Sequence, residues 1–243
     1  MNYVFDVDGT LTPSRMRMDR EFEKFFLKFI EKYNVYLVTG SDYEKTIQQV
    51  GSKICESVIK CFNCSGNSIW QNGEEIYTNT WDLSSDAVAW LKKELTASKF
   101  NIRTGQHIEY RPGLVNFSIV GRGADFEQRF LYTQWDQHKN ERKDIARRFN
   151  ETFTHYRAQV AGETGLDILR SNSDKRQVAD FIKGPISFFG DKMEYGGNDY
   201  PLADEIEQRN DTSCNYKVKD WKDTQRILFA IENSGLHKYV GVI

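Results

Sequence analysis

The chain has only four prolines and four cysteines among its 243 residues. No apolar run approaches the ~20 residues that span a bilayer, so we expect no contact with a membrane. The formal net charge is only −2, with both signs spread along the sequence, which gives no basic surface for nucleic acid. The first residues lack the charged and apolar segments of a secretory signal. We therefore expect a cytoplasmic, soluble protein whose partner is a small molecule.

The few cysteines argue against two further kinds of site. Cys61 and Cys64 form a Cys-x-x-Cys pair, but a zinc site needs a second pair of ligands at suitable spacing. A redox pair of this kind opens a helix, whereas the residues around this one favour the end of a strand. We expect the cysteines to be reduced and to serve in packing.

Two carboxylates follow the first apolar strand. Tyr3 to Phe5 predict a short buried strand and Gly9 the turn that ends it, so Asp6 and Asp8 leave the sheet on the same side. Two like charges this close need a cation or a proton between them. An all-oxygen site with phosphate nearby is what Mg²⁺ prefers. The stretch therefore predicts phosphoryl transfer assisted by Mg²⁺.

A second strand exit carries hydroxyl groups. A periodic helix is expected over residues 19–33 and an apolar strand over 35–38, ending in Thr39 and Ser41 ahead of another helix. The carboxyl ends of parallel strands meet at one edge of a sheet. Either hydroxyl is therefore expected to reach a phosphate held against Asp6, close to the unpaired amides of a helix start.

A third strand exit adds two more acids. The apolar strand expected at 186–189 leads into a glycine-rich loop that contains Asp191 and Asp199. Taken alone, these residues are typical of turns. Together with Asp6 and Asp8 they make four acids at two strand exits of one sheet, a set that requires a compensating metal ion.

The pattern of elements predicts an α/β fold with an inserted domain. The length fits one large domain or two modest ones. Parallel-sheet units are expected at residues 1–81 and 175–243, and an α+β domain with an antiparallel sheet at 82–174. The other expected elements are strands at 58–62, 154–160 and 166–169, a hairpin around Asn72-Gly73, two β runs in 102–121 broken at Pro112-Gly113, and helices at 86–95, 125–132, 142–153 and 174–183.

Four short motifs occur in the order Asp6-Val7-Asp8-Gly9-Thr10, Thr39-Gly40-Ser41, Lys175, and Gly190-Asp191 followed by Gly196-Gly197-Asn198-Asp199. They resemble the four motifs of the haloacid dehalogenase superfamily in their usual order. Longer stretches resemble the eukaryotic-type phosphomannomutases nearly from end to end. These are Phe5 to Thr12, Gly40 to Asp42, Ile108 to Arg111, Asn116 to Arg122 and Phe188 to Asp199. The resemblance implies a Rossmann-like core with a mobile type 2 cap inserted after the second motif.

The resemblance also implies roles for the core residues. Asp6 would be the nucleophile that forms a phosphoaspartyl intermediate, and Asp8 the general acid and base for the sugar hydroxyl. Lys175, with Thr39 or Ser41, would neutralise the transferring phosphoryl group.

The implied cofactor is Mg²⁺. It would be held by Asp6, the backbone carbonyl of Asp8 and Asp191, with Asp199 in a supporting position.

The resemblance further implies that the residues binding the rest of the substrate lie mostly in the cap. Arg111, Arg122 and Arg129 would bind the second phosphate, because planar guanidinium groups suit phosphate oxygens. Arg15 would stand near the core entrance, and Asp167 toward the sugar hydroxyls. The family resemblance further implies a homodimer formed through the cap.

Three functions remain open from the sequence. The first is a hexose-phosphate mutase that interconverts mannose 1-phosphate and mannose 6-phosphate with a hexose bisphosphate activator. The second is a Mg²⁺-dependent sugar-phosphate phosphatase. The third is a catalytically silent sugar-phosphate sensor, against which the complete set of acids argues. A mutase needs two phosphate-gripping sites and a phosphatase only one, so the cap arginines favour the mutase.

Three departures from the mutase pattern bear on this choice. Gly165 stands where a substrate-binding serine is expected, and residues 169–174 lack the family's aromatic and turn residues. Thr39 occupies a position that is often glycine in the mutases and threonine in sugar-phosphate phosphatases with the same cap. This last departure favours hydrolysis.

Overall fold

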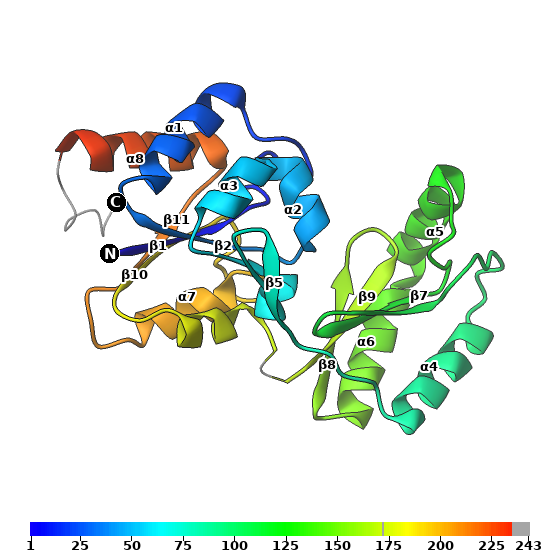
Figure 1. Cartoon of the computed structure of the whole chain (residues 1–243). Helices are drawn as coiled ribbons and strands as arrows, with labels where there is room; N and C mark the ends of the chain where they lie inside the picture. Colours follow the sequence, from blue (N-terminus) through cyan, green and yellow to red (C-terminus); the bar gives the residue numbers. More distant parts are fainter. Residues whose placement is uncertain (172, 235–243) are drawn as a thin grey trace. The chain divides into compact units, whose positions relative to one another are not determined.

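The computed structural model describes residues 1–171 and 173–234, and the chain divides into two compact units (Figure 1). Met1–Thr78 together with the chain from Ser173 onward forms one, here called the core unit, and Asn79–Asn172 forms the other, the cap unit. The sequence pattern predicted an insertion at 82–174, so the compact unit begins three residues earlier and ends two residues earlier. Asn172 lies outside the described residues.

The core unit contains a seven-stranded sheet with the order β11-β10-β1-β2-β3-β4-β5. The first strand, β1 (Asn2–Asp6), pairs in parallel with β10 (Ile186–Gly190) and with β2 (Asn34–Val38). This central place follows from its composition, because a strand covered on both faces is apolar throughout. The remaining strands are β3 (Lys60–Asn63), β4 (Ser68–Gln71), β5 (Glu74–Thr78) and β11 (Cys214–Lys217).

The far edge of this sheet is antiparallel, where β4 pairs with β3 and with β5. Asn72 and Gly73 join β4 to β5 with φ angles of 53° and 80°. Two consecutive positive φ values are what a two-residue hairpin turn requires. The hairpin predicted from Asn72-Gly73 is confirmed.

Helices cover both faces of the core sheet. Side chains alternate along a strand, so Tyr3 and Phe5 of β1 join one apolar cluster while Val4 joins another on the opposite face. On the first face lie α1 (Arg20–Ile30), α2 (Tyr43–Val50), α3 (Ser52–Ser57) and α8 (Trp221–Ser234), and on the second η2 (Lys175–Phe181) and α7 (Tyr200–Glu207).

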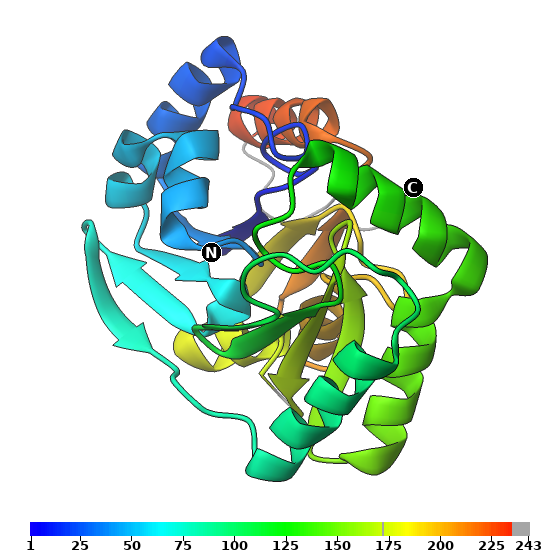
Figure 2. The ribbon, with the colours of Figure 1, turned by 90° about the vertical axis from the view of Figure 1, so that its right-hand side faces the viewer.

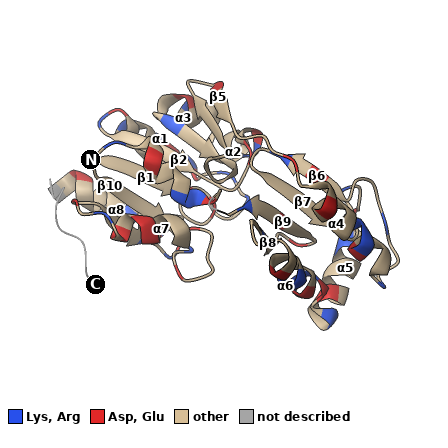
Figure 3. Cartoon of the chain, turned by 90° about the horizontal axis from the view of Figure 1, so that it is seen from below, with Lys and Arg blue, Asp and Glu red and all other residues tan. Residues whose placement is uncertain are grey.

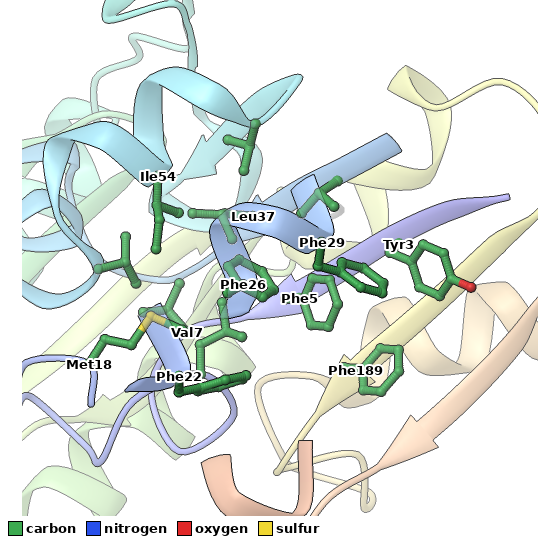
Figure 4. Close-up of a cluster of buried hydrophobic side chains, with 14 of the residues drawn as sticks. Tyr3, Phe5, Val7, Met18, Phe22, Phe26, Phe29, Leu37, Ile54 and Phe189 are labelled. Atoms are coloured by element: carbon green, nitrogen blue, oxygen red, sulfur yellow. The ribbon is translucent and has the colours of Figure 1, made fainter. Parts of the chain in front are cut away.

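Helix α1 anchors the first face. The Asp19 carboxylate accepts hydrogen bonds from the backbone of residues 21 and 22 and so caps the helix start. Phe22, Phe26 and Phe29 follow at helical spacing, and all three are buried. The Phe26 ring meets Phe5 edge-on, with centroids 5.1 Å apart (Figure 4). This packing holds β1 in place directly before the acidic loop.

Several predicted elements differ from the structure. The strand expected at 58–62 begins at Lys60, because α3 ends only at Ser57 and the next two residues lead from the helix into the strand. The helix expected at 174–183 is a 3₁₀ helix, Lys175–Phe181. Helix α7, strand β11 and helix α8 follow Asp199, where the sequence pattern predicted no element. Thr224, Leu228 and Ile231 of α8 are buried at helical spacing, so the sequence carries a helical period there that the prediction did not use.

The cap unit is a four-stranded antiparallel sheet with the order β6-β7-β9-β8, and Figure 2 shows it from a second direction. Helices pack on one face of the sheet, where side chains from both layers form a single apolar cluster. The elements are β6 (Ile108–Arg111), β7 (Leu114–Ser118), β8 (Tyr156–Ala161), β9 (Gly165–Arg170), α4 (Ser85–Ala97), α5 (Phe126–Lys139) and α6 (Glu141–Thr152). The two β runs predicted on either side of Pro112-Gly113 are present.

The other face of the cap sheet is polar. Glu109 pairs in register with Asn116, and Asn116 with Asp167, so these three side chains share one face across three strands. Val115 and Leu166 point the other way, into the apolar cluster. One-sided burial of this kind is typical of antiparallel sheets, and it leaves the other face of the sheet to polar side chains.

Charges of both signs are interspersed along the elements of each unit (Figure 3). Within residues 1–171 and 173–234, no helix is long and apolar enough to cross a bilayer.

The cap core gives a test of this packing. Phe149 is fully buried and its ring meets Trp90 edge-on at 5.5 Å, whereas Lys143 on the same helix is exposed. Phe149→Ala is expected to lower the free energy of unfolding of the cap unit by about 3–5 kcal/mol, because it leaves a cavity. Lys143→Ala should change it by no more than about 0.5 kcal/mol. Urea unfolding followed by tryptophan fluorescence measures both, and equal losses would contradict the assigned core.

Candidate active site

Three buried or half-buried carboxylates meet at the carboxyl edge of the core sheet. Asp6 ends β1, Asp191 follows β10, and Asp199 immediately precedes α7. Their oxygens lie within 4.8 Å of one another. The register pairs Phe5 with Phe189 in parallel, which brings the two strand exits side by side. The sheet topology therefore assembles acids that are almost 200 residues apart in sequence.

A buried lysine from η2 joins these acids. Lys175 is 1% exposed, and its Nζ donates to Asp6 Oδ1 at 2.5 Å and to Asp199 Oδ1 at 2.6 Å. A buried ammonium group is stable only when charged partners satisfy it. The structure therefore brings together four of the predicted site residues, Asp6, Lys175, Asp191 and Asp199.

The charges in this cluster shift one another's protonation. Burial, followed by the charge of Asp199, raises the pKa of Asp6 to about 7, against the opposing charge of Lys175. Burial alone would lower the pKa of Lys175, but the charges of Asp199 and Asp6 and their hydrogen bonds raise it above its ordinary value. Lys175 is therefore protonated at neutral pH, while Asp6 retains affinity for a proton or another cation.

The same cluster fits a metal ion. Asp6 Oδ2 and Asp191 Oδ1 are buried and have no hydrogen-bond partner within the described part of the chain. Gly9, at φ +87°, lets the backbone pass close by, since a Cβ there would lie 2.4 Å from Asp191 Oδ2. Carboxylate oxygens are the ligands that hard divalent cations prefer. Asp6, Asp191 and Asp199 could therefore hold such an ion.

Asp8 is oriented differently from the prediction. The sequence placed a cation between Asp6 and Asp8, but the clustered carboxylates are Asp6, Asp191 and Asp199. Asp8 Oδ1 instead accepts hydrogen bonds from Gln49 Nε2 at 2.8 Å and from the backbone N–H of Arg15 at 2.7 Å. The expectation of four clustered acid side chains is wrong because these donors hold the Asp8 carboxylate.

The hydroxyl-bearing turn lies beside Asp6. β1 and β2 pair in register from Asn2 to Asp6, so Thr39 follows directly after the partner of Asp6. Thr39 is buried and its Oγ1 accepts from the Ser41 backbone N–H at 3.1 Å. Asp42 caps α2 by accepting from the Lys45 backbone N–H at 2.9 Å. Phosphate binding by Thr39 or Ser41 stays a prediction.

The polar face of the cap sheet gathers further predicted residues. Glu109 Oε2 accepts from Arg111 Nε at 2.9 Å and pairs with Arg122 Nε at 2.9 Å. Asn116 Nδ2 donates to Asp167 Oδ1 at 2.7 Å. Burial raises the pKa of Asp167 against this hydrogen bond and the charges of Arg111 and Arg122. Two arginines and two acids thus form one polar cluster.

Arg129 lies outside this cluster of pairs. Its Nη2 donates to Glu163 at 2.5 Å, in an exposed pair. Its expected contact with a substrate phosphate therefore remains untested. Arg15 is exposed, adopts a left-handed φ of 58° and donates its backbone N–H to Asp8 Oδ1.

Gly165 has a structural role. A Cβ at this position would lie 2.7 Å from Asn116 Nδ2. The serine expected there would therefore displace the side chain that binds Asp167. The absence of a side chain at Gly165 therefore leaves room for the hydrogen bond between Asn116 and Asp167.

Two residues of the site were given no role from the sequence. Gln49 binds Asp8, and its only signal is a polar side chain on the buried side of a helix, one turn after the buried Thr46. Glu109 stands in a recognised motif and shares a strand face with Arg111, two residues on. Its pairing with Arg122 depends on the path of the chain after β7.

Comparison with known proteins identifies a family whose model matches this chain. The model of the family described as eukaryotic phosphomannomutase matches residues 22–234. The chain is 31% identical to the phosphomannomutase of Drosophila melanogaster over 94% of each protein. It is 26% identical to the phosphomannomutase of Saccharomyces cerevisiae over 95% of this chain and 93% of the yeast protein.

A solved structure shares the fold. A haloacid dehalogenase-like hydrolase from Bacteroides thetaiotaomicron aligns with a TM-score of 0.55 over 84% of each chain, at 13% identity. Similarity at this identity concerns the fold alone. It agrees with the predicted haloacid dehalogenase-like architecture.

Metal binding at the acid cluster is expected to depend on pH. The folded chain keeps a proton on Asp6 up to pH about 7, where an unfolded chain has lost it, so the metal-free fold loses stability as pH rises from about 4 to 7. A divalent cation replaces this proton. Mg²⁺ should therefore raise the melting temperature more at pH 8 than at pH 5.5, and Asp6→Asn should remove most of the difference. Equal stabilisation of the native chain at both pH values would contradict the assignment.

Proposed function

The chain belongs to the eukaryotic phosphomannomutase family, and we propose that it is a hexose-phosphate mutase that interconverts mannose 1-phosphate and mannose 6-phosphate. The observation that carries the proposal is the buried contact of Lys175 with Asp6 and Asp199. It presents a carboxylate beside a fixed positive charge, which suits attack on a phosphoryl group.

In the proposed reaction, Asp6 attacks the phosphorus of a hexose phosphate and forms a phosphoaspartyl intermediate. Asp8 gives a proton to the leaving sugar oxygen and later takes one from the accepting hydroxyl. Lys175, with Thr39 or Ser41, balances the charge of the phosphoryl oxygens. A bound Mg²⁺ would supply further positive charge there; Asp6, the Asp8 carbonyl and Asp191 would hold it, with Asp199 in support.

The cap unit supports transfer to sugar rather than to water. Arg111 and Arg122 converge on Glu109, and we propose that they bind the phosphate that does not react, together with Arg129. Asp167, held by Asn116, is proposed to bind sugar hydroxyls. A mutase must grip both phosphates, because a bisphosphate is its intermediate and reacts at either end in turn.

A sugar-phosphate phosphatase is the second candidate. Thr39 at the second motif and Gly165 in place of a serine are the observations that favour it. It would use the same Asp6 chemistry, with water as the acceptor.

The two candidates differ in their products. Mannose 1-phosphate supplied with a hexose bisphosphate primer should yield mannose 6-phosphate, and free phosphate should form more slowly. Asp6→Asn should abolish both products. Phosphate without isomer would overturn the mutase proposal, and turnover by Asp6→Asn would overturn the mechanism.

The Arg122→Ala variant further distinguishes phosphoryl transfer to sugar from transfer to water. We expect it to lower isomerisation by about 10–100-fold, since a charged hydrogen bond to phosphate contributes about 1.5–3 kcal/mol. The rate of any residual hydrolysis should fall less, because transfer to water does not require the second phosphate to be bound. Arg147→Ala is the matched control, as Arg147 is an exposed cap arginine paired with Asp144 and Glu151. Equal losses of isomerisation and hydrolysis would contradict a role for Arg122 in the second grip.

We also propose that the chain forms a homodimer through the cap. Of the apolar residues on the cap helices, Trp90 and Leu91 of α4 pack within the cap core. Phe126 and Phe130 of α5 are 86% and 53% exposed. Two exposed aromatic rings one turn apart support an interface there.

Sedimentation tests this interface. Phe130→Asp should shift the chain from dimer to monomer, because it places a charge in an apolar contact. Ile76→Asp, at an apolar residue of the core unit that is 51% exposed, should leave the dimer unchanged. A native chain that sediments as a monomer would refute the proposal.

A further inference from the structure

The loop between β1 and α1 is tied to helix α2 through one glutamine. Gln49 is 6% exposed. Its Nε2 donates to Asp8 Oδ1 at 2.8 Å and lies 3.4 Å from Thr12 Oγ1. Its backbone carbonyl accepts from the Met18 N–H at 2.8 Å. One buried residue therefore holds the loop at three points.

Asp8 receives both of its described hydrogen bonds at the same oxygen. Gln49 Nε2 and the Arg15 backbone N–H converge on Oδ1 from two segments of the chain. Arg15 adopts a left-handed φ of 58° to do so. Two donors at one oxygen fix the plane of the carboxylate as well as its position, because a single hydrogen bond would leave it free to rotate.

We propose that Gln49 is a positioning residue for proton transfer by Asp8, holding Oδ1 so that Oδ2 faces the reacting hydroxyl. This inference rests on the role of Asp8 in the proposed function. A buried amide suits the task, since it donates a hydrogen bond without adding a charge beside the acid cluster. The side chain is also buried, which limits the rotamers that it can adopt.

The proton follows a balanced path in both half-reactions. In the first, a bond forms between an Asp6 oxygen and phosphorus, the bond from phosphorus to the sugar oxygen breaks, and the Oδ2 proton of Asp8 moves to that oxygen. In the second, an acceptor hydroxyl returns a proton to Oδ2 while its oxygen bonds to phosphorus and the bond to Asp6 breaks. Only the placement of Oδ2 depends on Gln49.

Leaving groups of different basicity reveal such a role. A sugar alkoxide is a poor leaving group and needs the proton, whereas p-nitrophenolate leaves readily without it. Loss of proton transfer therefore slows the departure of sugar and spares that of p-nitrophenolate. A merely structural defect in the site slows both.

The test compares Gln49→Met with Gln48→Met. Methionine keeps the length of glutamine and removes the donor, and Gln48 is the exposed neighbour in the same helix. Gln49→Met should lower kcat for mannose 1-phosphate, with primer, by roughly 10–100-fold, a part of the 10²–10⁴ that proton transfer contributes. KM should change less than about threefold. The single-turnover burst of p-nitrophenolate from p-nitrophenyl phosphate should stay within about threefold, and Gln48→Met should match the native chain in every assay.

An equal loss of both reactions, or no loss of either, would overturn the proposal. If Gln49→Met does not fold, Gln49→Leu serves as the second variant, with the melting temperature as a check. If the native chain releases only free phosphate, the mutase proposal fails. The comparison of sugar and aryl phosphates then still decides the role of Gln49.

Discussion

The buried contact between Lys175 and the aspartates is the interaction on which the rest of the core depends. Three carboxylates meet the buried Lys175, and the half-exposed Lys192 adds a looser pairing with Asp191 at 3.6 Å, so the two lysines offset only part of the negative charge. Such a group is stable in a sheet edge only if every member is held firmly. The phenylalanines of α1 fix β1 and Asp6, and the glycines at 9 and 190 let the loops approach. The remaining negative charge is what makes the edge suitable for a cation and a phosphoryl group.

The two units carry different parts of the proposed reaction. The core unit has the acids and the lysine that suit transfer of a phosphoryl group to and from Asp6. The cap unit has a polar sheet face on which Arg111 and Arg122 share Glu109, and Asn116 holds Asp167. An antiparallel sheet with helices on one side leaves such a face available. In the proposed reaction, cap residues would therefore decide the identity of the acceptor, and core residues would carry the chemistry at phosphorus.

Sequence reasoning succeeded where topology alone decides position. Asp6 and Asp191 were predictable as neighbours, because parallel strands end at a common edge whatever their side chains do in detail. Gln49 was not, since its contact with Asp8 depends on the rotation of α2 about its axis. The elements after Asp199 were not predicted either, although the buried residues of α8 recur at helical spacing. The 3₁₀ form of the segment that starts at Lys175 likewise follows from tertiary packing rather than from propensity.

The order of residues along the chain also constrains how the site can form during synthesis. Lys175 is 169 residues from Asp6 but only 24 from Asp199. The first acidic loop leaves the ribosome long before its counter-charge, and the whole of the contiguous cap sequence is made in between. Contacts of such long sequence separation close late and slowly. The contact of Lys175 with Asp6 can therefore form only after the cap sequence has been translated, so the proposed active site is completed last.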